Sequence, residues 1–171
     1  MFSSKIYESW RSLQYEKFSF LVKHYPQFFT GTILDLACGN NFLKHYFKSK
    51  NVNINIISSD IVLNAKHSHN LHEPLVQCNI SGGDVVADGA NLPFPSESFE
   101  KIISIDALHL FRPDLRVLKK GGLILASIFF NDDNFEERKS LLYSRLEGLF
   151  VTNELIFKGQ EKELFVLARS I

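Results

Sequence analysis

The sequence is poor in cysteine, in net charge and in long apolar runs, and each shortage excludes a class of protein. Its two cysteines, Cys38 and Cys78, are too few for a disulfide framework, which favours a reducing compartment. Basic and acidic side chains both number 19, so no broad basic field favours a nucleic-acid partner. No apolar run reaches the roughly 18 residues that a membrane-spanning helix needs, and the charged N-terminus lacks the apolar core of a signal peptide. We therefore expect a cytoplasmic protein with no membrane partner.

The length and composition that remain are those of one globular domain. The 171 residues are 45% hydrophobic and 22% charged, and no repeat, low-complexity tract or Pro/Gly-rich linker divides them. We predict a single domain over residues 1–171, with an N-terminal helical segment at 1–29 and an α/β core at 30–171. Apolar residues at helical spacing predict a helix from Ile6 to about Phe29, which Pro26 is expected to end.

Beyond residue 30, short apolar runs alternate with helical stretches. Strands are expected at 32–35, 53–58, 84–87, 101–105 and 122–130, and helices at 41–49 and 135–149. Two last strands, at 150–158 and 161–168, are joined by Gly159-Gln160, a hairpin signal. The order predicts an α/β fold in which a mostly parallel seven-stranded sheet has helices on both faces and a C-terminal antiparallel hairpin. For residues 61–83 we expect an irregular stretch with one short helix.

The first predicted strand runs into a turn that indicates a ligand site. In GTILDLACGNNFL, residues 31–43, a strand ends at Asp35 and a helix starts shortly afterwards. Small residues at Ala37 and Gly39 let the backbone approach a ligand, and the N-terminus of the helix suits a carboxylate or phosphate. The same strand–turn–helix pattern also occurs in α/β proteins that bind nothing there.

Two later aspartates follow strands at the same edge of the predicted sheet. Asp60 ends the second strand and Asp88 follows the third, so both would lie beside the crevice at the carboxyl ends of the strands. The Asp60 carboxylate can accept hydrogen bonds from ribose hydroxyls, and a helix N-cap or solvated loop residue is the alternative. Asp88 can accept from an exocyclic amine while the Gly89 N–H meets a ring nitrogen, and a turn-forming Asp-Gly pair is the alternative.

Four segments of the chain match one known family in content and in order. They are DLACG at 35–39, ISSDI at 57–61, DVVADGANLPFPSESFEKIISIDALHLF at 84–111 and RVLKKGGLILAS at 116–127. Together they resemble the motifs of the class I S-adenosylmethionine-dependent methyltransferases, especially the small type 11 group. The resemblance implies a Rossmann-like methyltransferase fold, S-adenosylmethionine as the cofactor, and transfer of its methyl group to an unidentified small-molecule or protein acceptor.

The resemblance implies a role for each matching position in the first motif. Asp35, Ala37 and Gly39 would line the methionine part of the cofactor. The family commonly has a glycine where this chain has Asn41. Asparagine tolerates a left-handed backbone better than most residues, so the turn can survive the change.

The later motifs imply contacts to the rest of the cofactor. Asp60 would hold the ribose, and Ile61 would pack on the adenine. Asp88 and Gly89 would read the adenine edge. Asp106, at the end of the fourth strand, would lie near the sulfonium and the acceptor.

Methyl transfer from a sulfonium needs a base only when the acceptor must lose a proton, so we expect few catalytic residues. His109 is the candidate base, with a structural histidine as the alternative. Asp106 is the candidate for orienting an acceptor amine or hydroxyl, with cofactor binding or helix capping as the alternatives. Tyr7, Trp10 and Tyr15 on the first helix are candidates for a lid, with a place in the core as the alternative.

Two further sequence patterns are assigned no functional role. His67, His69 and His72 are closely spaced, but no nearby cysteine completes a tetrahedral set, so no metal site is predicted. Cys38 resembles a family cysteine that packs inward, so no nucleophilic role is predicted for it.

Two other functions compete with methyl transfer. A methyltransferase-like domain could have lost cofactor binding or turnover and could serve as a partner or scaffold subunit. Asn41 and the short distance from Asp106 to Gly121 motivate this alternative, and a homodimer or a partner chain would then complete the acceptor site. A nicotinamide-dependent reductase would need G-x-G-x-x-G, with glycine where Ala37 and Phe42 stand.

Overall fold

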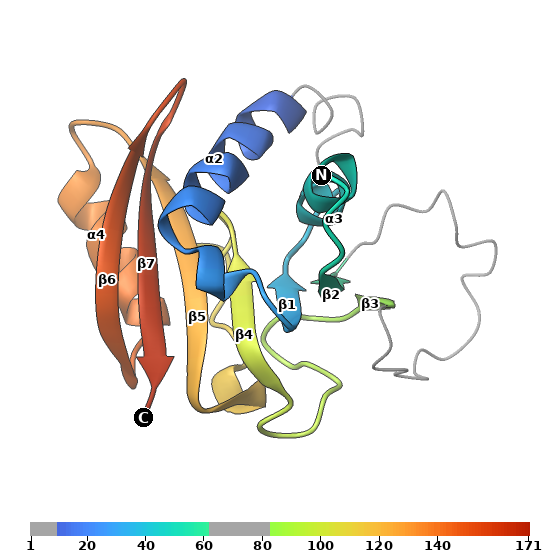
Figure 1. Ribbon diagram of the computed structural model, residues 1–171. Helices are drawn as coiled ribbons and strands as arrows, with labels where there is room; N and C mark the ends of the chain where they lie inside the picture. The colour runs from blue at the N-terminus through green and yellow to red at the C-terminus, as the bar shows by residue number, and fades with distance from the viewer. Residues whose placement is uncertain (1–9, 62–82) are drawn as a thin grey trace.

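The computed structural model describes residues 10–61 and 83–171, and the strands of these residues form one seven-stranded sheet (Figure 1). The strands are β1 (Thr32–Leu36), β2 (Asn55–Asp60), β3 (Asp84–Val86), β4 (Phe99–Ser104), β5 (Leu118–Phe130), β6 (Leu149–Lys158) and β7 (Lys162–Ser170). Their order in the sheet is β3-β2-β1-β4-β5-β7-β6. Strands β1 to β5 pair in parallel, whereas β7 is antiparallel to both β5 and β6. The predicted parallel sheet with its C-terminal antiparallel hairpin is confirmed.

Helices cover both faces of this sheet, as predicted. Helices α2 (Arg11–His24) and α3 (Phe42–Ser49) pack on one face, and α4 (Phe135–Arg145) packs on the other (Figure 1). Alternation along the strands supplies both cores, because Ile33 of β1 joins the cluster under α2 and α3 while Leu34 joins the cluster under α4. No helix among the described residues is both long and apolar enough to cross a membrane.

Two predicted helix ends are wrong, each for a local reason. Helix α2 ends at His24 rather than near residue 29, because Pro26 begins a separate 3-10 turn. Helix α4 ends at Arg145 rather than at 149, because Gly148 turns the chain at a φ of 86° and Leu149 begins β6. Between β4 and β5 the described chain has only a 3-10 turn at Leu115–Val117, as the short spacing there indicated.

The loops that follow β1 and β4 contain residues in the left-handed region, where a side chain is strained. After β1 the φ angles are 60° at Ala37, 54° at Gly39 and 58° at Asn41, and after β4 the φ of Asp106 is 51°. Because β1 lies between β2 and β4, these two loops leave adjacent strands at the same edge of the sheet. This edge is where open α/β sheets bind ligands. The left-handed turn predicted for Asn41 is confirmed.

We expect the left-handed backbone at Asn41 to set a clear order of stability among substitutions there. Asn41→Ala should lower the free energy of unfolding by about 1 kcal/mol, because alanine is strained at this φ. Asn41→Gly should cost less, because glycine adopts this conformation without strain. Urea denaturation of the three proteins measures the order, and an alanine variant as stable as the glycine variant would contradict it.

Candidate functional site

A cavity of about 680 Å³ lies at the carboxyl edge of the parallel strands, between α2 and the loops that follow β1 to β4. All the residues that the sequence analysis assigned to a cofactor or to catalysis line this cavity. They are Asp35, Ala37, Gly39, Asp60, Ile61, Asp88, Gly89, Asp106 and His109. The structure therefore brings together residues from four separate loops, while the role of each one stays a prediction.

The Asp35 carboxylate near the end of β1 is buried in the cavity wall and has no hydrogen-bond or ion-pair partner among residues 10–61 and 83–171. Its exposed fraction is 5%, and its side chain makes no hydrogen bond or ion pair with the rest of the described chain. Burial raises the pKa of this carboxyl to about 7, against the opposing charge of Lys44 and with a smaller contribution from Asp60. A buried, unpaired carboxylate is costly, and a ligand cation placed beside it would offset that cost.

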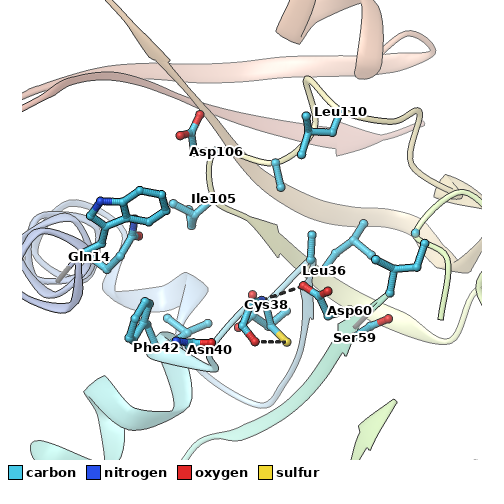
Figure 2. Close-up of a pocket in the computed structure, with 18 of the residues that line it drawn as sticks. Gln14, Leu36, Cys38, Asn40, Phe42, Ser59, Asp60, Ile105, Asp106 and Leu110 are labelled. Carbon is cyan, nitrogen blue, oxygen red and sulfur yellow. Dashed lines mark hydrogen bonds between the residues drawn. The ribbon is translucent and has the colours of Figure 1, made fainter. Parts of the chain in front are cut away.

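The loop after β1 is held in shape by the end of β2. The Gly39 N–H donates to Asp60 Oδ2 over 2.8 Å (Figure 2). The Cys38 N–H donates to the Ser59 carbonyl oxygen over 3.1 Å. Asp60 therefore fixes the loop and lines the cavity at the same time. Burial raises the pKa of the Cys38 thiol far above its usual range, which leaves it protonated and a poor nucleophile, in line with the role predicted for it.

The loop after β3 combines a turn with a close packing contact. The Ala90 N–H donates to Asp88 Oδ1 over 2.9 Å, so Asp88 forms the turn that the sequence left as an alternative, and it also lines the cavity. A Cβ at Gly89 would lie 2.4 Å from a ring carbon of Phe111, so a larger residue here would require the Phe111 ring to shift. Ile61 borders the cavity with a largely exposed side chain.

Asp106 and His109, after β4, form a separate polar group, and Figure 2 places Asp106 well apart from Asp60 across the site. The Phe129 N–H donates to Asp106 Oδ1 over 3.0 Å, and the Asp106 N–H donates to Ser127 Oγ over 2.9 Å. His109 Nδ1 lies 3.9 Å from Asp106 Oδ1, too far for a hydrogen bond. Burial lowers the pKa of His109 although Asp106 opposes the shift, so the imidazole is neutral near pH 7.

Sequence reasoning missed the part of the wall that α2 and the C-terminal strands provide. It includes Gln14, Lys17, Phe18, Phe129 and Glu161. Lys17 had a visible signal, because a lysine within the apolar stripe of a helix is rarely buried unless it is paired. Glu163 has no comparable signal, because it ends the charged stretch at 161–163 that precedes the apolar run of the strand.

The three lid candidates have different outcomes. Trp10 lines the cavity. Tyr15 packs edge-on against Tyr46 with ring centroids 5.4 Å apart, in agreement with the core alternative. Tyr7 lies outside the described residues. The same is true of Cys78 and of the histidines at 67, 69 and 72.

Comparison with known proteins identifies the family of this chain. A family model described as "Methyltransferase domain" matches residues 34–126, which is more than half of the chain. Among curated proteins, human arginine-hydroxylase NDUFAF5, mitochondrial, is 29% identical over 122 residues, which cover 67% of this chain and 33% of that protein. The chain thus spans about a third of the length of the curated relatives that it matches.

Two solved structures have the same fold at low sequence identity. The PH0226 protein from Pyrococcus horikoshii is 15% identical at a TM-score of 0.62, with 99% of this chain and 92% of that chain covered. The 1,6-didemethyltoxoflavin-N1-methyltransferase from Burkholderia thailandensis, solved with S-adenosylhomocysteine, is 14% identical at a TM-score of 0.60, with 89% and 75% covered. These likenesses agree with the Rossmann-like strand order, and the family match is what decides membership: this chain belongs to the methyltransferase domain family, as a class I S-adenosylmethionine-dependent domain of the type 11 group.

Proposed function

We propose that this chain is a methyltransferase that binds S-adenosylmethionine in the cavity at the carboxyl edge of the sheet and acts on a small-molecule or protein acceptor. The observation that supports this most strongly is the buried Asp35 carboxylate, which has no partner in the described chain and faces the cavity. The cofactor has an ammonium and a sulfonium, so its binding would supply the missing positive charge.

The other carboxylates of the cavity suit the remaining parts of the cofactor. Asp60 would accept hydrogen bonds from the ribose hydroxyls at the point where it already holds Gly39. Asp88 and Gly89 would meet the adenine edge, and Ile61 would pack on the ring. These roles follow the motif positions, and all four residues line the cavity.

The chemistry requires little from the protein besides position. When bound, S-adenosylmethionine supplies a methyl group on a sulfonium, which is already activated for in-line displacement. Asp106 would orient an acceptor amine or hydroxyl from the loop after β4. His109 has a neutral imidazole and would take the acceptor's proton where the acceptor must lose one. The aromatic side chains of Trp10, Phe18 and Phe129 would exclude water from this part of the cavity.

The curated relatives are named as arginine hydroxylases, so hydroxylation is a second reaction to consider. Hydroxylation of arginine inserts oxygen and needs an oxidant that a methyl donor does not provide. The match covers only a third of those proteins, and the family match covers the methyltransferase motifs. We therefore propose methyl transfer for this chain, with a catalytically inactive partner or scaffold subunit as the alternative that the binding experiments distinguish.

We expect Asp60→Ala to weaken binding of S-adenosylmethionine by about tenfold or more, because charge-assisted hydrogen bonds are worth about 1.5–3 kcal/mol each. Trp10 is the single tryptophan and lines the cavity, so its fluorescence reports binding alongside calorimetry. Asp132→Ala, which removes an exposed aspartate outside the cavity, is the matched control. Unchanged affinity in folded Asp60→Ala would reject the ribose role, and no binding by the wild type would favour the scaffold subunit.

We expect Asp35→Asn to change the dependence of stability on pH. A folded-state pKa near 7, above the ordinary value of 3.8, means that the Asp35 contribution to stability falls as pH rises between these values. The Tm of Asp35→Asn minus the Tm of the wild type should therefore be larger at pH 8 than at pH 5. One pKa unit is worth about 1.4 kcal/mol, or roughly 3–6 °C in a domain of this size.

Thermal unfolding of the wild type and Asp35→Asn at both pH values measures this difference. The same variant should bind S-adenosylmethionine more weakly, since it lacks the carboxylate that meets the cofactor's positive charge. An equal difference in Tm at pH 5 and pH 8 would show that the pKa of Asp35 is not raised in the folded protein.

A further inference from the structure

A chain of buried polar groups runs from helix α2 to the loop after β4. It begins at Lys17 of α2, whose side chain is 1% exposed and pairs with the fully buried Glu163 of β7. A second carboxylate, that of Glu161, lies 3.3 Å from the Lys17 ammonium. The Ser127 hydroxyl of β5 donates to Glu163 Oε1, and Ser127 Oγ accepts the Asp106 N–H over 2.9 Å. Three elements distant in sequence thus converge on the backbone of Asp106.

Asp106 needs such support because of its conformation. Its φ of 51° lies in the left-handed region, which is unfavourable for a residue with a side chain. Strand β5 holds it at two points, because Ser127 accepts from its N–H and the Phe129 N–H donates to its Oδ1 over 3.0 Å. Ser127 and Phe129 are two positions apart on one strand, so both face Asp106.

Stability alone does not account for the buried ion pair behind Ser127. Replacing such a pair with packed apolar residues is often neutral or stabilising, so an ion pair here suggests a further purpose. Burial raises the pKa of Glu163 to about 7, and the Lys17 ammonium opposes this shift. Glu163 therefore depends on Lys17 to stay ionised and to remain a strong acceptor for the Ser127 hydroxyl.

We propose that Glu163 and Ser127, with Lys17 as the counter-charge, are positioning residues that hold Asp106 in its left-handed conformation with its carboxylate at the acceptor side of the cavity. The arrangement also joins Asp106 to helix α2, because Ser127 and Glu163 connect its backbone to Lys17. The catalytic meaning of this position rests on the proposed methyl transfer, but the positioning itself is a property of the protein without any ligand.

The decisive variant is Ser127→Ala, which removes the hydroxyl between Glu163 and Asp106. Ser104→Ala is the matched control, because Ser104 is a fully buried serine of the neighbouring strand β4 whose Oγ has no hydrogen-bond partner among the described residues. The probe is hydrogen exchange of the Phe129 amide, followed by NMR without ligand. This amide bonds to the Asp106 carboxylate and not to Ser127, so its exchange reports whether Asp106 keeps its place.

We expect Phe129 exchange to accelerate by about tenfold or more in Ser127→Ala and to stay unchanged in Ser104→Ala. Ser127→Thr retains the hydroxyl and should restore slow exchange. If Ser127→Ala does not fold, Glu163→Gln is measured in the same way, with the same acceleration expected because its amide is a weaker acceptor than a carboxylate. Unchanged Phe129 exchange in the folded variant overturns the proposal.

A second measurement separates this proposal from the proposed function. A carboxylate held beside a sulfonium favours S-adenosylmethionine over uncharged S-adenosylhomocysteine at that atom. Ser127→Ala should therefore weaken binding of the methyl donor more than binding of the product, whereas a general loss of structure would weaken both equally. If the wild type binds neither molecule while Phe129 exchange still accelerates in Ser127→Ala, the positioning role stands and the proposed function fails.

Discussion

The hydrogen bond from the Gly39 N–H to Asp60 Oδ2 is the contact on which the site depends. Parallel pairing of β1 with β2 brings the two strand ends to the same edge, with Leu36 opposite Ser59. The Asp60 carboxylate then holds the loop after β1 against β2, which requires left-handed backbone within that loop. Helix α3 can begin at Phe42 only because the loop turns in this way. One aspartate thus shapes the cavity wall and provides an acceptor within it.

The two most deeply buried carboxylates among the described residues illustrate different uses of burial. Asp35 and Glu163 both have pKa values raised to about 7 by desolvation. Glu163 is compensated within the protein by Lys17 and the Ser127 hydroxyl, so its role is internal. Asp35 has no such partner in the described chain and borders the cavity, so its cost is a reason to expect a cationic ligand. Proteins commonly accept such local instability where function needs it.

Much of the site could be read from the sequence because its signals are local. A strand that ends at an aspartate, a turn with small residues and an Asp-Gly pair are short patterns, and the motif order placed all nine predicted residues around one cavity. The left-handed conformation of Asn41 was predictable in the same way, because it reflects what one side chain tolerates. The errors at the ends of α2 and α4 were also local, since Pro26 and Gly148 ended each helix earlier than the apolar pattern suggested.

The sequence by itself determined the alternation of strands and helices, the loop residues of the cavity and the resemblance to a methyltransferase family, because each depends on neighbours a few positions apart. Only the tertiary structure decided that Lys17 of the first described helix meets Glu163 of the last strand. It also decided that Asp35 has no cation beside it within the described chain and that Ser127 supports Asp106. The physical reason is that partners and desolvation are set by which segments pack together, and strand β7 reaches α2 only because it inserts between β5 and β6.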